Sequence, residues 1–229
     1  MQQIVVTDLT RFKNKTTLCL AGVTLDGKTC LRPLPYQEFL ACKKLNLLPG
    51  SILAGDFSKL PADGPHVEDV SFSNVKVIRA CTSEEFRDVL QKSQSPGIDK
   101  GFGTTVSGKV ILVSDPMPTA SIITLRVAPD TFAIGEDGFG KLRGSFTDSA
   151  GKMLSGLSVT DLGFFEHVGD AAKRRMTASA ATTFIRSQKE LYLRIGLSRR
   201  YKVDSRDGYW AQINGIYTFP DYATIVRKY

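Results

Sequence analysis

Alternating apolar and polar positions predict two strands near the C-terminal end of the chain. Leu191, Leu193, Ile195 and Leu197 alternate with more polar residues, and a second alternating run covers residues 209–219. This period of two is typical of strands that bury one face. A hairpin turn at Asp207-Gly208 would set the apolar face of one strand against the charged face of the other, because a one-residue shift exchanges the faces. We therefore expect a bulge or a longer loop within residues 199–207.

The rest of the chain also reads as short strands joined by hairpin turns. Asp26-Gly27 predicts a two-residue turn between strands at 17–25 and 28–34. Further strands are expected at 51–57, 70–81, 109–113, 121–127, 131–135, 141–147 and 152–160, and helices at 36–45, 83–90, 164–168 and 178–189. Short strands at this spacing favour small sandwiches or barrels over a parallel α/β sheet.

We therefore predict a mainly β protein built from two consecutive OB-like barrels, the five-stranded fold that carries oligonucleotides and oligosaccharides on one face and two loops. The first barrel is expected at residues 1–115 and the second at 116–229. The boundary is placed at Asp115-Pro116-Met117-Pro118, since two nearby prolines stiffen a connection and interrupt strand pairing.

Positive charge is concentrated at the C-terminal end. The net charge is +7, yet residues 1–172 contain 18 Lys and Arg against 19 Asp and Glu, whereas residues 173–229 contain 12 against 4. A concentrated positive field is typical of a polyanion partner, most often nucleic acid. A solvated basic face without a partner stays open as the alternative.

The candidate contacts follow from this charge. Phosphate contacts are predicted from five cations of the C-terminal strands: Arg194, Arg199, Arg200, Lys202 and Arg206. Tyr209 or Trp210 would offer a stacking face for a base, although a lone tryptophan in a strand is more often buried. The basic run Lys173, Arg174 and Arg175 would bind phosphates, or it would be an exposed segment before a helix that has no binding role. Arg11 and Arg32 would extend the basic track or form structural ion pairs.

Few residues of the chain could form a catalytic site or a metal site. The two histidines, His66 and His167, are far apart, and the PHVED segment offers His66, Glu68 and Asp69 as a weak metal-binding corner or a general base. A turn stabilised by the acidic side chains is the favoured reading of that segment. No P-loop, GxGxxG or GxSxG motif occurs, so no cofactor is expected. The four cysteines lack CxxC spacing, which predicts reduced thiols.

No window approaches 18 uninterrupted apolar residues and no export signal is visible, so we expect a cytoplasmic protein without a membrane partner. Beside nucleic acid, two alternatives remain at this point. One is a module that recognises a protein or nucleotide partner, and the other is a nucleic-acid modification enzyme that uses the PHVED loop.

Several segments together resemble bacterial dual OB-domain proteins. They are VTDLTRF at 6–12, AGVTLDGKTCLRPLP at 21–35, LPGSIL at 48–53, PHVED at 65–69, and the ending LYLRIGLSR at 191–199 with GYWAQINGIYTFPDY at 208–222. The resemblance covers nearly the whole chain. It implies a non-catalytic nucleic-acid-binding module, an accessory or adaptor subunit associated with nucleic-acid modification or defence systems.

Overall fold

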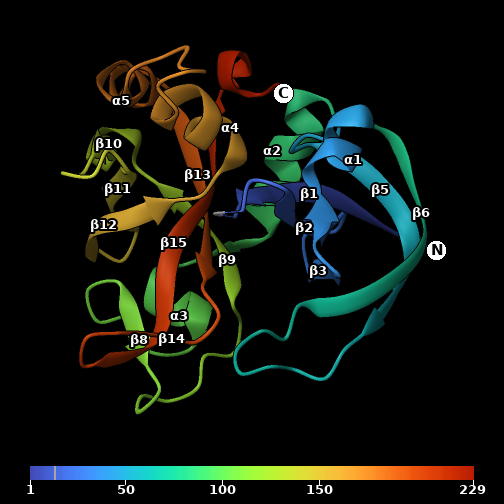
Figure 1. The fold of residues 1–229 in the computed structure, drawn as a ribbon, viewed down its shortest axis with the longest axis horizontal. Helices are drawn as coiled ribbons and strands as arrows, with labels where there is room; N and C mark the ends of the chain where they lie inside the picture. Colours follow the sequence, from blue (N-terminus) through green and yellow to red (C-terminus); the bar gives the residue numbers. More distant parts are fainter. Residues whose placement is uncertain (13) are drawn as a thin grey trace.

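The computed structural model describes residues 1–12 and 14–229, which form two β-sheets with short helices around them (Figure 1). The first sheet contains β1 (Gln2–Arg11), β2 (Thr17–Thr24), β3 (Cys30–Leu34), β4 (Gln37–Glu38), β5 (Ser51–Lys59) and β6 (Asp69–Ala80). The second contains β7 (Gln94–Ser95), β8 (Val110–Leu112), β9 (Ile122–Val127), β10 (Ala133–Glu136), β11 (Leu142–Thr147), β12 (Met153–Val159), β13 (Glu190–Leu197), β14 (Tyr201–Val203) and β15 (Arg206–Phe219). The α-helices are α1 (Phe39–Lys44), α2 (Ser83–Lys92), α3 (Ile98–Phe102), α4 (Leu162–Phe164) and α5 (Ala178–Arg186). Shorter helical turns are η1 (Pro129–Thr131), η2 (Phe165–Gly169) and η3 (Thr224–Val226).

The first sheet closes into a five-stranded barrel. β1 pairs with both β2 and β5, β5 pairs with β6, and β6 runs parallel to β3, which pairs with β2. Apolar residues of alternating positions, such as Ile4, Leu20 and Leu53, fill its interior. The predicted hairpin centred on Asp26-Gly27 is confirmed, with Gly27 at a φ of 76°. The predicted two-residue turn is wrong, because the last backbone pair is Thr24 with Thr29 and residues 25–28 form a four-residue loop. This closed barrel, together with the mainly β content, confirms the OB-like fold class.

The second sheet repeats this connectivity. β12 and β15 form a parallel pair, as β3 and β6 do, and β15 also pairs with β13, which pairs with β9. β9 and β10 together take the place of β1, because β9 pairs with β13 and β10 pairs with β11. A bridge between Val127 and Asp148 joins the two sides of this sheet. We call residues of β9 to β13 and β15 the second barrel.

Two short strands that follow α2 belong to the second sheet. β7 pairs with β9, and β8 pairs with β15, although both precede the predicted division at Asp115. The chain therefore enters the second sheet directly after α2, while the division into residues 1–115 and 116–229 stays a prediction. The N-terminus of α2 is fixed by a capping box, in which Thr82 accepts from the Glu85 amide and Glu85 accepts from the Thr82 amide.

Buried polar contacts hold the two barrels together. Arg194 of β13 donates to Asp8 of β1 at 2.8 Å, and the Tyr217 hydroxyl of β15 donates to the Thr7 carbonyl oxygen at 2.6 Å. The Glu68 carboxylate accepts hydrogen bonds from the Ser121 amide and hydroxyl and from the Ile122 amide. Because a buried charge is tolerated only when it is paired, these contacts require both barrels to be in place.

Candidate nucleic-acid interface

A two-stranded hairpin projects from the second barrel between β13 and β15. Its turn lies at Asp204-Ser205, with Val203 opposite Arg206 and Asp204 at a φ of 53°. Asp207-Gly208 lies inside β15 instead of forming the turn. A Cβ atom at Gly208 would overlap the backbone oxygen of Ile111 in β8, so this glycine serves a close strand contact. The predicted irregularity is confirmed, because the chain leaves strand pairing at Arg199 and Arg200 before β14 begins.

Four of the predicted contact residues lie on or beside this hairpin, and each is at least partly exposed. Arg200, Lys202 and Arg206 are exposed, and Trp210 is half-buried. The Arg206 guanidinium lies 4.9 Å from the centroid of the Trp210 ring, which is a cation–π distance. The Trp210 Nε1 donates to the Tyr201 carbonyl oxygen at 3.0 Å, so the ring is held against the hairpin. An oriented ring with a cation beside it suits stacking on a base.

Charge compensation differs among these cations. Arg200 donates two hydrogen bonds to Asp207, at 3.0 and 2.7 Å, and these bonds lower the pKa of that carboxyl. Lys202 and Arg206 form no ion pair with any residue in the described ranges 1–12 and 14–229. These two therefore present the uncompensated positive charge of the hairpin.

Of the two predicted stacking residues, only Trp210 reaches the surface. Tyr209 is 7% exposed and belongs to the core of the second barrel, with its ring 6.2 Å from that of His66. Trp210 points to the outer face, as alternation along β15 requires. The contact predicted for Tyr209 is therefore wrong because its side chain is buried, and the alternative of a core position for Trp210 is not the one found.

The outer face of β11, β12 and β15 continues from the hairpin. Ser158 of β12 lies beside Gln212 of β15 in the parallel register, and Gln212 has the same parity as Trp210. Arg143 of β11 lies opposite Ser158 and donates to its hydroxyl, and Arg143 also pairs with Asp137 at 2.8 Å. We call this surface the basic face. Its members are Lys109, Arg143, Ser145, Ser155, Ser158, Arg206, Trp210 and Gln212. Lys202 lies opposite Asp207 in the hairpin, so its side chain is on the other face of the hairpin.

Sequence reasoning missed the part of the basic face that lies on β11 and β12. The signal was present, since Arg143, Ser145 and Thr147 alternate with buried residues along β11. Lys109 joins the face because its Nζ donates to the Gly156 carbonyl oxygen at 3.2 Å. In an OB-like barrel, these strands and the loop that carries the hairpin are the positions where ligands bind.

Three residues predicted to contact phosphates instead form buried ion pairs, so they cannot reach a phosphate. Arg194 is 1% exposed and bonds Asp8, the Thr124 hydroxyl and the Cys30 sulfur. Arg32 is bound to Asp69 at 2.6 Å, and Arg11 is bound to Glu166 at 2.6 Å. Of the two roles that remained open for Arg11 and Arg32, the structural ion pair is the one found.

Arg199 also joins the two barrels. Its guanidinium bonds Asp69 at 2.7 Å and Asp63 at 3.3 Å, and about a third of the side chain is exposed. Because both carboxylates belong to the first half of the chain, the charge of Arg199 is neutralised across the interface between the barrels.

Lys173, Arg174 and Arg175 lie away from the hairpin. They lie between α4 and α5, at the top of Figure 1, whereas β14 is at the bottom. Lys173 pairs with Glu166 at 2.7 Å and Arg174 pairs with Glu136 at 2.7 Å, while Arg175 is exposed. The structure therefore does not bring this run together with the basic face.

The PHVED loop has a structural role. His66 is 1% exposed, and burial, followed by the nearby charges of Arg32 and Arg199, lowers its pKa to about 4. Glu68 is saturated by donors of the second barrel, and Asp69 bonds Arg32 and Arg199. Across residues 1–12 and 14–229, no group of three His, Cys, Asp or Glu side chains is placed to hold a metal ion.

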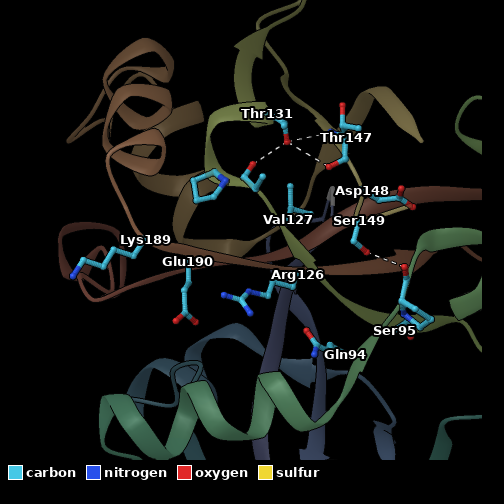
Figure 2. Close-up of a pocket in the computed structure, with 13 residues that line it drawn as sticks. Gln94, Ser95, Arg126, Val127, Thr131, Thr147, Asp148, Ser149, Lys189 and Glu190 are labelled. Carbon is cyan, nitrogen blue, oxygen red and sulfur yellow. Dashed lines mark hydrogen bonds between the residues drawn. The ribbon is translucent and has the colours of Figure 1, made fainter. Parts of the chain in front are cut away.

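A groove of about 870 Å³ lies on the opposite edge of the second sheet, along β7 and β9 (Figure 2). Arg126 and Lys189 are its cationic lining residues, and in Figure 2 Lys189 extends away from Arg126 with Glu190 between them. Glu190 is bound to Arg87, and Asp148 accepts from the Ile98 amide. The cations do not converge, so we do not assign an anion site to this groove.

Comparison with known proteins adds little to this geometry. No protein-family model matches the chain, and no curated protein matches it. One solved structure, a murine DNA-binding protein bound to double-stranded DNA, has 10% sequence identity and a TM-score of 0.33, with 93% of this chain and 97% of that chain covered. At this TM-score the likeness carries no argument about what the present chain binds. None of the helices in the described residues is long and apolar enough to cross a membrane.

Proposed function

We propose that the protein is a non-catalytic nucleic-acid-binding module that takes single-stranded or structured DNA or RNA on the basic face. The supporting observation is that Arg206 lies over the half-buried Trp210 ring at the edge of that face, while Lys202 adds a second uncompensated cation on the other face of the same hairpin. Cations that follow the phosphate backbone and an aromatic ring that stacks on a base are the two elements of such binding. The serine and glutamine side chains between them add hydrogen-bonding capacity without demanding one sequence.

The resemblance to bacterial dual OB-domain proteins supports a more specific role. In this proposal the module is an accessory or adaptor subunit of a bacterial nucleic-acid modification or defence system in the cytoplasm. The oligonucleotide partner would then be recognised here, and catalysis would be supplied by another subunit. The side chains of the PHVED loop favour this division, because Glu68 and Asp69 already have structural partners.

The test is fluorescence anisotropy with labelled single-stranded and double-stranded oligonucleotides of DNA and RNA at two salt concentrations. We expect single strands to bind and the double variant Lys202→Glu/Arg206→Glu to lose at least about tenfold in affinity, because two phosphate contacts become repulsive. Two such contacts also predict a slope of log K against log salt of about −1.4, which the variant should abolish.

The matched control is Lys43→Glu/Lys44→Glu, which makes the same charge change at exposed lysines of α1 on the first barrel. It should retain the wild-type affinity and slope. Equal losses in both variants would mean that net charge alone drives binding, and the basic face would then be the wrong site. A purified protein free of nucleic acid that carries a stoichiometric protein partner would favour a protein-recognition module.

A further inference from the structure

The first barrel contains an apolar cavity that the proposed nucleic-acid interface does not use. Its volume is about 610 Å³, within the range of small-molecule pockets. The lining includes interior residues of the barrel strands, among them Leu20, Leu53 and Phe57, and residues of α1 and β6. The cavity therefore extends from the core of the barrel to the surface between α1 and β6.

The opening exists because α1 is too short to cover this end of the barrel. α1 has six residues and buries only Cys42, while Leu45 at its C-terminal end lines the cavity and stays 60% exposed. Val75 and Val77 of β6 also line the cavity and are 37% and 40% exposed. In a small barrel the interior positions are normally filled by side chains, so these residues form an uncovered part of the core.

The chemistry of the lining restricts what fits. Apart from Gln37 and Lys76, the lining residues are apolar or, like Cys42, a buried thiol. Burial raises the pKa of the Cys42 thiol to about 11, so this group is neutral near pH 7. Lys76 is the one charged lining residue, and no carboxylate within residues 1–12 and 14–229 forms an ion pair with it. No acidic residue lines the cavity, so an anionic group is favoured over a cationic one at its rim.

We propose that this cavity binds a small anionic amphiphile, with an aliphatic chain inside the first barrel and the anionic head group at the rim near Lys76. Burial of the chain supplies the driving force, because each buried methylene contributes about 0.8 kcal/mol. The site is on the first barrel and the basic face is on the second, so the two proposals stand or fall separately.

The experiment is calorimetric titration of the full chain with dodecanoate, and with dodecylamine as a cation of equal chain length, both below their micelle concentrations. We expect dodecanoate to bind at one site and dodecylamine to bind at least about tenfold more weakly. Ala41→Phe, at an exposed α1 position that lines the cavity, should weaken dodecanoate binding by at least about tenfold by filling the space. Val77→Phe provides a second filling variant if the first does not fold.

Charge variants separate the head group from the chain. Lys76→Glu should weaken dodecanoate binding and strengthen dodecylamine binding, whereas Lys100→Glu, the same change at an exposed residue of α3, should alter neither. No saturable binding to wild-type protein, or an affinity for dodecanoate in both filling variants equal to that of the wild type, would overturn the proposal. A concentration-dependent dimer that Ala41→Phe abolishes would overturn it as well, because a second copy would then cover the cavity.

Discussion

The ion pair between Arg194 and Asp8 makes a prediction that separates structural from binding roles. Arg194 is the largest fully buried side chain of the described residues, and its guanidinium bonds Asp8, Thr124 and Cys30. Arg194→Met keeps most of the apolar stem and removes the charge. The Asp8 carboxylate, 1% exposed, then loses its cationic partner.

The expected cost follows from that burial. Removing one partner of a buried ion pair costs about 3–5 kcal/mol, because the remaining charge is left uncompensated in the interior. This is a large fraction of the roughly 5–15 kcal/mol by which a folded protein is stable. The double variant Asp8→Leu/Arg194→Met removes both charges and should recover much of the loss, since an apolar pair of similar volume replaces a buried ion pair at little cost.

Urea denaturation followed by circular dichroism measures the free energy of unfolding of Arg194→Met, of the single variant Asp8→Leu and of the double variant. With a urea m-value near 3 kcal/mol/M, the Arg194→Met midpoint should fall by about 1–2 M. Oligonucleotide affinity of the folded variant should equal that of the wild type, because Arg194 does not reach the surface. A midpoint that hardly moves together with an affinity loss of about tenfold would refute the argument and restore Arg194 as a phosphate contact.

Three further predictions follow from single residues. Trp210→Ala should weaken single-strand binding by about tenfold, since a base–aromatic stack contributes about 1–3 kcal/mol, while Tyr209→Phe should not, and equal losses in an anisotropy titration would count against the assignment. The folded-state pKa of His66 is about 4, and its ordinary value is about 6.5. The free energy of unfolding should therefore keep the full contribution of neutral His66 above pH 6.5 and should fall by ~3 kcal/mol as the pH is lowered towards 4. Urea denaturation at about pH 7 and about pH 4.5 should show this loss in the wild type and much less in His66→Leu, and the same pH dependence in both proteins would contradict it. Gly208→Ala should lower the free energy of unfolding by about 1–3 kcal/mol through overlap with β8, and an unchanged Tm would show that the strands can separate.

Local patterns predicted the fold well because each barrel is built from hairpins. The turn at Asp26-Gly27 and the alternation along β11 and β13 are properties of neighbouring residues. Local patterns do not predict how the barrels close, because the parallel pairs β3–β6 and β12–β15 join segments that are far apart in the chain. The pairing of β7 with β9 could not be predicted either, because two strand residues are too few to show an alternating pattern.

The candidate site was harder to predict because charge alone does not tell an exposed cation from a buried one. Arg194 and Lys202 both occur in strands near the C-terminal end, yet one faces Asp8 and the other faces solvent. The difference depends on an acid from the opposite end of the chain. The choice between Tyr209 and Trp210 as the stacking residue stayed open for a related reason, since alternation gives two faces without saying which face is buried.

The charge surplus of residues 173–229 has two separate causes. Within the described residues, six of its twelve Lys and Arg side chains form ion pairs: Lys173, Arg174, Arg194, Arg199, Arg200 and Arg227. All of these except Arg200 pair with carboxylates from residues 1–172, so their charge compensates acids of the other part of the chain. Regional net charge therefore overstates the field available to a polyanion. What remains is a small set of uncompensated cations. Of these, Arg206 lies over the half-buried Trp210 ring, and Lys202 lies on the other face of the same hairpin.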